Sequence, residues 1–351
     1  YGDSPIGKIV TNNARKSGLL GKILRWLIPL GFSAGAFWLV LREIAFSQII
    51  DNLAKINFRI YLLASLAFFM SYFFRVFCWY LLLRRKVSYK DVFFTMGVGY
   101  LLNNIFPFRL GEIGRAVLLD DPQGPSALEV LSSVLVERIF DVFLAAVFVL
   151  SMLPRILGES FDHTMILIAF ILTIAGLVVL FIAVRFRDCI MNWVKRWGER
   201  AIFVKTWIEP KVSQVLEGLT VLNDPRAFLL AFFCLAISWF IAFGENYIIF
   251  QSLYPQPPFW WMIFVLSVGA FGAALPAAPS GLGVFEGVMV AAFALLGVGS
   301  KTAFTHAIVI HALAFVFTNI LGLLGLRLRG EAVIGLYQRV VNRSTENRPA
   351  G

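Results

Sequence analysis

The chain has 351 residues, of which 59% are hydrophobic and 15% are charged, and its formal net charge is +10. Soluble domains carry about a quarter charged residues, so this composition excludes the soluble classes and is typical of a protein that crosses a membrane several times. The basic residues gather at the ends of apolar runs, where they would face anionic lipid headgroups, and they do not indicate a nucleic-acid surface. The three cysteines are scattered, which predicts neither a disulfide framework nor a metal site, and no cofactor is expected.

Six apolar runs are long enough to cross a membrane, because about 20 helical residues span its hydrocarbon core. These predicted spans cover roughly residues 23–41, 58–83, 131–153, 163–185, 227–251 and 303–328. The predicted fold is therefore an all-α polytopic membrane protein. We expect residues 1–18 to be a disordered or non-native extension, residues 19–330 to form a single transmembrane domain, and residues 331–351 to be a cytoplasmic tail.

Basic residues alternate between the loops that join these spans. The N-terminal side, the second and fourth loops and the C-terminal side are rich in Lys and Arg, whereas the third and fifth loops are poor in them. The positive-inside rule then places both termini in the cytoplasm, and we expect the protein in the inner membrane of the cell. Residues 186–222 mix tryptophans with basic residues, which predicts an amphipathic segment on the membrane surface.

Two polar segments interrupt the apolar sequence, at residues 103–115 and 276–287. Each contains Pro-x-x-x-Gly with an acidic residue soon after it, and proline and glycine break or sharply turn a helix. Broken backbone and charge are costly in a bilayer, so they usually line a site or a pathway. We predict two re-entrant, broken helical hairpins whose hinge positions are Pro107, Gly111, Gly114, Pro279, Gly281 and Gly283.

Each predicted hairpin lies between two long spans, which gives two units at about 58–153 and 227–328. Two crossings separate the first span of one unit from the first span of the other, so the units enter the membrane in opposite directions. This is the inverted repeat of secondary transporters, which bind substrate between the repeats. Arg75 and Glu245 occupy equivalent places in the two units, and each needs a partner inside the protein.

The first segment carries groups that suit an anion. A helix that begins near Gly111 would present free N–H groups and the positive end of its dipole. Arg109 and Arg115 flank that position, and a guanidinium group binds phosphate in a bidentate manner. Glu112 is either their counter-ion or a ligand for a cationic headgroup or a proton. The sequence therefore predicts a phosphate site at this break.

Further charged and polar residues complete the predicted site. An acidic pair and an arginine share a face at the start of the third span and suit a gate or a counter-charge. Two interpretations are open for Glu286, a functional role or an ion pair with an arginine of the first segment, and two for His306 and His311, buried hydrogen bonding or proton transfer. The predicted substrate-binding residues are Asn103, Asn104, Arg109, Glu112, Arg115, Glu137, Arg138, Asp141, Ser280, Glu286 and His311.

Three motifs in this order, at 102–115, 137–141 and 279–287, resemble the flippase-like membrane domain of lysylphosphatidylglycerol synthases. That family includes stand-alone membrane proteins, and the likeness covers roughly residues 20–330. In the fused members the domain is thought to move the aminoacylated lipid between leaflets, and related members are linked to polyprenyl-phosphate sugar lipids. The motif positions that the resemblance supports are Asn104, Pro107, Arg109, Gly111, Glu112, Arg115, Glu137, Arg138, Asp141, Pro279, Gly281, Gly283 and Glu286.

One departure from the family concerns the last repeat span, where many members carry an Arg and a Tyr. This chain has His311 and Phe315 in that neighbourhood, so a different headgroup choice is expected. Little sequence follows the last predicted span, so we expect a stand-alone member without an aminoacyl-transferase domain, and the resemblance does not imply synthase activity.

The sequence thus predicts a flippase- or scramblase-like translocase that moves a phospholipid or a polyprenyl-phosphate-linked lipid through a central polar cavity. Arg109, Arg115 and Arg138 would hold the phosphate. The alternative is an intramembrane enzyme that acts on a lipid phosphate with Glu112 or Glu137 as base. We expect no catalytic residue, because the sequence shows no convincing nucleophile–base pair. The expected partner is a membrane lipid, and a second copy of the chain and a lipid-modifying enzyme are further candidates.

Overall fold

The computed structural model describes residues 51–54, 56–106, 109–157, 164, 167, 171, 175, 186–200, 212, 224–272 and 278–346. The regular structure in these residues is helical throughout, so the all-α prediction is confirmed. The span predicted at 23–41 and Pro107 lie outside the described residues, as do nearly all of the span predicted at 163–185 and of the segment 201–222.

Four long helices form the frame of the bundle, and their bounds lie within a few residues of the predicted spans. They are α3 (Phe58–Leu82), α6 (Ala127–Leu157), α10 (Pro225–Phe250) and α13 (Ser300–Leu328). Among the described helices, α3, α13 and the Arg226–Phe250 part of α10 are long and apolar enough to cross a membrane.

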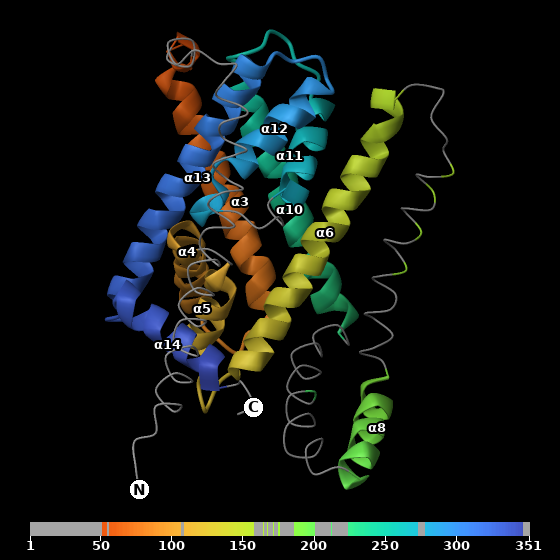
Figure 1. Cartoon of the computed structure of the whole chain (residues 1–351), viewed down its shortest axis with the longest axis vertical. Helices are drawn as coiled ribbons and strands as arrows, with labels where there is room; N and C mark the ends of the chain where they lie inside the picture. Colours follow the sequence, from red (N-terminus) through yellow and green to blue (C-terminus); the bar gives the residue numbers. More distant parts are fainter. Residues whose placement is uncertain are drawn as a thin grey trace, which may run out of the picture.

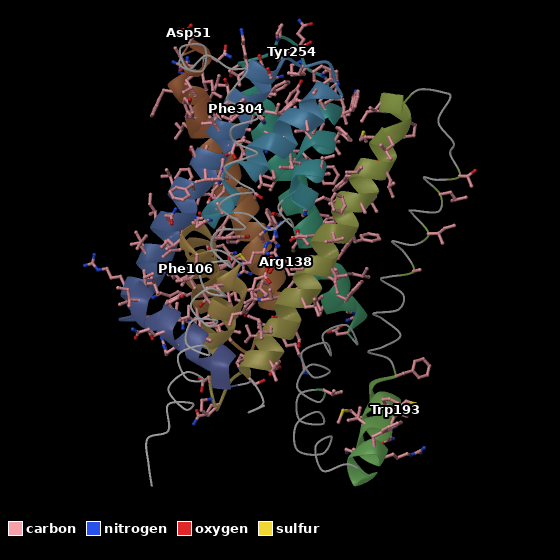
Figure 2. All side chains as sticks on the ribbon, viewed as in Figure 1. Asp51, Phe106, Arg138, Trp193, Tyr254 and Phe304 are labelled. Atoms are coloured by element: carbon pink, nitrogen blue, oxygen red, sulfur yellow. The ribbon has the colours of Figure 1, made fainter. Side chains whose placement is uncertain are left out.

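The outer faces of these helices are apolar, which water would disfavour and lipid would not. Along α3, for example, seven large hydrophobic side chains are exposed: Phe58, Leu62, Leu63, Leu66, Phe69, Met70 and Phe73. Figure 2 shows side chains of this kind along the whole length of the bundle. The length of the helices and their exposed apolar faces together confirm a membrane protein with several spans.

Shorter helices form a broken hairpin in each half of the chain. The first hairpin consists of α4 (Tyr89–Ile105) and α5 (Leu110–Leu119). The second consists of α11 (Trp260–Gly272), the 3-10 turn η3 (Pro279–Gly281) and α12 (Val284–Ala294). In Figure 1 the first hairpin occupies the lower half of the bundle and the second occupies the upper half, so neither reaches the full length of the long helices.

The helix pairings follow a two-fold pattern. Helix α3 packs against α10; α4 packs against α13, as α11 packs against α6; and α5 packs against α6, as α12 packs against α13. Figure 1 also shows α3 and α13 running downward, whereas α6 and α10 run upward. Exchanging the first unit for the second therefore reproduces the pairings with reversed directions, which supports the predicted inverted repeat.

Close backbone contact joins the two halves at the α4–α13 pairing. A Cβ added to Gly97 would lie 3.0 Å from atoms of Leu321, and one added to Gly322 would lie 2.7 Å from the carbonyl oxygen of Gly97. A Cβ on Gly325 would likewise lie 2.8 Å from the carbonyl oxygen of Phe94. Small residues at this seam allow a close approach that larger side chains would prevent.

The break between α4 and α5 follows the prediction from its proline. Phe106 has φ −113° and ψ 143°, the extended conformation favoured before proline. Arg109 is left-handed, with φ 52°, and α5 then begins at Leu110. A Cβ on Gly111 would lie 1.9 Å from the carbonyl oxygen of Gly99, so only glycine allows α4 and α5 to pack this closely.

The second break is a tight turn. Pro279 opens η3, and three of the next four residues, Ser280, Gly281 and Gly283, have positive φ values of 62°, 76° and 82°. Glycine adopts such a conformation readily, whereas serine does so at a cost. Helix α12 begins directly afterwards, and Glu286 lies in its first turn as predicted.

Two helices lie outside this frame. Helix α8 (Arg187–Arg200) carries exposed Trp193 and Trp197, whose ring centroids are 5.5 Å apart, in agreement with a surface helix for this part of the segment 186–222 (Figure 2). Helix α14 (Val333–Glu346) falls in the expected tail and was not predicted. Its Leu336 side chain is buried, and its Tyr337 ring stacks on Phe106 with centroids 4.5 Å apart, so it packs against the first hairpin.

Candidate functional site

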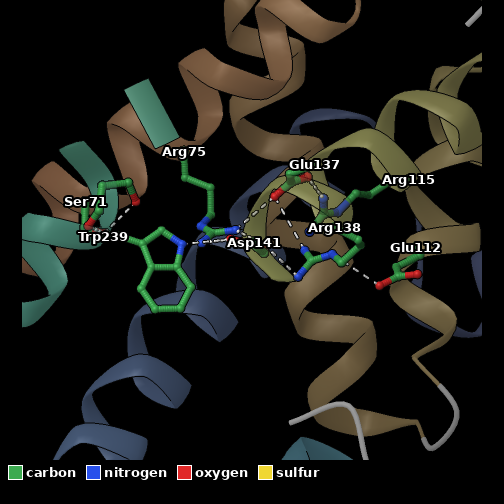
Figure 3. A network of polar contacts seen from close by, with 9 residues as sticks. Ser71, Arg75, Glu112, Arg115, Glu137, Arg138, Asp141 and Trp239 are labelled. Atoms are coloured by element: carbon green, nitrogen blue, oxygen red, sulfur yellow. Dashed lines mark hydrogen bonds and ion pairs between the residues drawn. The ribbon is translucent and has the colours of Figure 1, made fainter. Parts of the chain in front are cut away.

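Six of the charged side chains that face the interior meet where α3, α5 and α6 converge (Figure 3). Helix α6 supplies Glu137, Arg138 and Asp141 from neighbouring positions on its surface, as the i, i+4 spacing predicts. We call the group the arginine–carboxylate cluster; its members are Arg75, Glu112, Arg115, Glu137, Arg138 and Asp141.

Asp141 and Arg75 form the best-defined pair of the cluster. Two nitrogens of Arg75 donate to the two oxygens of Asp141 at 2.8 Å each, which is the bidentate geometry of a strong ion pair. The indole nitrogen of Trp239 donates to Asp141 at 3.0 Å, and Arg75 also donates to Glu137 at 3.1 Å. These contacts tie α3, α6 and α10 together.

Arg115 is enclosed by the protein. Its side chain and that of Glu137 are both 0% exposed, and they are 3.1 Å apart. The Arg115 guanidinium also lies over the rings of Trp79 and Tyr100, 5.1 and 5.2 Å from their centroids. A buried charge is costly unless it is paired, so Glu137 and the two rings are what allow Arg115 to lie here. In this conformation Arg115 cannot touch a lipid.

The accessible side of the cluster is formed by Arg138, Glu112 and Arg109. The Arg138 side chain is 30% exposed and Glu112 is 28% exposed, and the gap between them is long at 3.5 Å. Arg138 also donates to Asp141 at 3.2 Å. Arg109 is exposed at the break and is close enough to interact electrostatically with all three of these residues. Arg109 thus adds a second arginine beside Arg138 and Glu112 on the side of the cluster that can be reached from outside the protein.

Ser280, His311 and Glu286 form a second group, which we call the serine–histidine–glutamate relay. His311 Nε2 lies 2.8 Å from Ser280 Oγ, and His311 Nδ1 lies 2.5 Å from Glu286 Oε1. The other oxygen of Glu286 accepts from the backbone N–H of Gly283 at 2.7 Å. Among the described residues Glu286 therefore pairs with a histidine.

The tips of the two hairpins meet at Asn104. Ser280 Oγ lies 3.3 Å from Asn104 Oδ1, and the Asn104 amide donates to Thr318 of α13 at 3.0 Å. The neighbouring Asn103 instead accepts from the N–H of Gly111 at 2.8 Å and closes the turn between α4 and α5. The structure thus brings together the two polar segments that the sequence singled out, and the contact between Asn104 and Ser280 joins them.

Other predicted positions have simpler surroundings. His306 is fully buried, 3.1 Å from Asn246 and edge-on to the rings of Phe250 and Phe293, which favours the interpretation of a buried hydrogen-bonding residue. Glu245 is buried on α10, and no ion pair joins it to another described residue. No group of three or more His, Cys, Asp or Glu side chains in the described ranges could hold a metal ion.

Sequence reasoning missed two contacts. The hydrogen bond from Trp239 to Asp141 was missed because a tryptophan in an apolar span is ordinarily a packing residue. The contact between Ser280 and His311 was missed because these residues are far apart in the sequence and only the fold brings them together.

The family profile described as the lysylphosphatidylglycerol synthase TM region matches residues 26–322. The chain belongs to this family. It is also similar to a UPF0104 membrane protein of Methanothermobacter thermautotrophicus, with 26% identity over 242 residues that cover 63% of this chain and 69% of that protein. No solved structure matches the chain. Family membership confirms the resemblance carried by the three motifs and agrees with a multi-pass membrane protein.

Proposed function

We propose that this family member moves a phosphate-bearing lipid, a phospholipid or a polyprenyl-phosphate-linked lipid, between the two leaflets of a membrane. The observation that carries the proposal is the accessible side of the arginine–carboxylate cluster, where the partly exposed Arg138 and the neighbouring Arg109 lie beside Glu112 in a bundle whose outer faces are apolar. Charged groups at this depth are costly and usually mark the path of a substrate. The basic loops further favour an inner-membrane protein with both termini in the cytoplasm.

Arg138 and Arg109 are the residues to which we assign the phosphate. The 3.5 Å contact between Arg138 and Glu112 is longer than the other ion pairs of Arg75 and Arg115, so an entering phosphate has a weak partner to displace. A guanidinium group offers a planar pair of donors that fits two phosphate oxygens. Arg115, which is fully buried, holds Glu137 in place and is not assigned a lipid contact.

The two hairpins supply the moving parts of the proposed mechanism. Their tips touch through Asn104 and Ser280, and each hairpin enters the bundle from its own end (Figure 1). Opening one hairpin at a time would expose the cluster to one leaflet and then to the other, while the acyl chains stay in lipid. Translocation itself needs no covalent step, and the sequence contains no Walker motif, so the energy would come from a gradient or from consumption of the lipid.

Leaflet exchange of a fluorescent phospholipid in liposomes that contain the purified chain tests the proposal. Liposomes with the wild-type chain should exchange the lipid faster than empty liposomes. Arg138→Ala should slow the exchange by about tenfold or more, because a hydrogen bond to a charged group contributes about 1.5–3 kcal/mol and 1.4 kcal/mol is tenfold.

Arg59→Ala is the matched control, because Arg59 is an exposed arginine near the start of α3 and belongs to neither polar group. It should leave the rate within twofold of the wild type. Equal rates for empty and protein-containing liposomes, or an unchanged rate in a well-folded Arg138→Ala chain, would contradict the proposal.

A further inference from the structure

The serine–histidine–glutamate relay has the geometry of an activated nucleophile. A carboxylate accepts hydrogen bonds, so we assign the proton of the contact between Glu286 and His311 to His311 Nδ1. His311 Nε2 is then an acceptor, 2.8 Å from Ser280 Oγ. The competing acceptor, Asn104 Oδ1, is farther from the serine at 3.3 Å. The serine proton is therefore directed at a base that is itself oriented by a carboxylate.

The carboxylate at the end of the relay is fixed in place. Glu286 is 2% exposed, and its second oxygen accepts the N–H of Gly283. The ring of Phe285 meets the His311 ring at 5.1 Å in an edge-on contact, which restrains the imidazole plane. His311 keeps 12% of its side chain exposed, so exposure increases from the acid toward the serine side. Acyl transfer needs this order, in which a buried acid holds a partly accessible base and the base contacts a hydroxyl group.

The backbone of Ser280 is a second, independent observation. Its φ of 62° and ψ of −3° lie in the left-handed region that side chains other than glycine rarely adopt. Such strained residues cluster at active sites, and a serine on a sharp turn before a helix is a known way to present a nucleophile. No described atom lies within 4 Å of the place that a Cβ on Gly281 would take, so the described residues leave room beside the serine.

We propose that Ser280, His311 and Glu286 form a catalytic triad that acts on the acyl ester of a membrane lipid, an activity beyond translocation. Ser280 Oγ attacks the ester carbonyl carbon, and its proton passes to His311 Nε2. The bond from carbon to the alcohol oxygen then breaks, and His311 returns the proton to the departing alcohol. Water, or the hydroxyl group of a second lipid, attacks the acyl-serine in the same way and regenerates Ser280.

The surroundings of the triad select the class of substrate. It lies at the tip of the second hairpin, between helices whose outer faces are apolar, and the neighbouring Leu282 side chain is exposed. An acyl lipid can bring its ester to this place while its chains remain in hydrocarbon. The positive dipole end of α12, which begins at Val284, lies close to Ser280 in the chain and favours the negative charge that develops on the carbonyl oxygen.

A fluorophosphonate probe that carries an alkyl chain tests the nucleophile in the purified full chain, because it reacts with activated serines and leaves a covalent adduct. The wild-type chain should gain one adduct by intact mass, which peptide mapping places on Ser280. Ser280→Ala should remove the adduct. His311→Gln and Glu286→Gln should slow labelling by about a hundredfold or more, because general-base assistance contributes about 10²–10⁴-fold.

Ser151→Ala is the control, since Ser151 is an exposed serine on α6 whose hydroxyl group donates to the carbonyl oxygen of Phe148 in the same helix. It should label as the wild type does. Thermal unfolding of each variant shows whether lost labelling reflects lost folding. An unlabelled wild-type chain, or labelling that survives Ser280→Ala, overturns the triad.

Two lipids separate this proposal from translocation. Liposomes of a diester phospholipid should release free fatty acid, or an acylated acceptor if a lipid hydroxyl is the acceptor, only when Ser280 is present. A diether analogue offers the same phosphate without a cleavable ester, so it reports translocation alone. If the chain moves the diether lipid but is not labelled by the probe and does not cleave the diester, the triad is wrong and the translocase stands. If the chain cleaves the diester but does not move the diether lipid, the translocase is wrong and the triad stands.

Discussion

The two hairpins share one frame but carry different chemistry. At the first, arginines and carboxylates of several helices form a charged cluster with a fully buried ion pair between Arg115 and Glu137. At the second, Glu286 contacts a histidine, which contacts a serine. The pairing of helices is the same on both sides, so the frame alone does not determine what each tip does. The side chains near the two breaks therefore make the difference, with paired charges beside the first and a serine, a histidine and a carboxylate at the second.

The largest expected effect comes from truncating the buried acid of each group, Glu137 of the arginine–carboxylate cluster and Glu286 of the serine–histidine–glutamate relay. Glu137→Ala leaves Arg115 buried without its carboxylate, which should lower the free energy of unfolding by about 3–5 kcal/mol. Glu286→Ala removes the hydrogen bonds to His311 and to the N–H of Gly283 but leaves no arginine buried without a carboxylate, so it should cost only about 1–3 kcal/mol. Thermal unfolding in detergent measures both changes. If both substitutions lowered the free energy of unfolding equally, the cluster would not depend more strongly on its buried ion pair than the relay depends on its hydrogen bonds.

Gly111→Ala should have the next largest effect, because it probes the frame rather than the tips. The added Cβ would meet the carbonyl oxygen of Gly99 at 1.9 Å, and backbone atoms cannot move aside cheaply. Overpacking of this kind costs about 1–3 kcal/mol in the free energy of unfolding.

Gly335→Ala in α14 is the matched control for this change, because no described atom lies within 4 Å of its added Cβ. It should raise stability slightly, by about 0.5–1 kcal/mol, through helix propensity. If both changes destabilised the chain equally, the close approach of α4 and α5 would not be the cause.

The smallest expected effect concerns the contact between the tips. Asn104→Ala removes the hydrogen bonds to Ser280 and Thr318 and should cost about 1 kcal/mol. The exposed Asn319 bonds only to its own helix, and Asn319→Ala should stay within about 0.5 kcal/mol of the wild type. Chemical denaturation of the purified chain separates the two. An Asn104→Ala chain as stable as the control would mean that the hairpins do not depend on this contact.

The sequence predicted the frame well because apolar length and helix breakers are local signals. The bounds of α3, α10 and α13 followed from the runs of hydrophobic residues, and the break before α5 followed from a proline and a glycine. Helix α14 was readable too, since Val333, Leu336 and Val340 recur at helical spacing. It was missed because the polar residues between them dominate the composition of the tail.

The partners of the site residues could be predicted less well, because they depend on the register of helices distant in sequence. The sequence marked Glu286 and His311 as polar residues in apolar surroundings, but it could not show that they touch each other or that Ser280 completes the row. It also placed Arg115 beside a phosphate, whereas packing against Trp79 and Glu137 encloses it. Burial of a charged side chain is a property of tertiary packing and leaves no mark in spacing.

The seam between α4 and α13 has a consequence for how the protein is made. Gly97 on the first hairpin packs against Gly322, which lies far later in the sequence and is therefore synthesised much later. During synthesis the first hairpin therefore remains without this packing partner until α13 has entered the bilayer. A protein truncated before α13 should consequently leave that hairpin unpacked, and neither half of the molecule is expected to mature on its own.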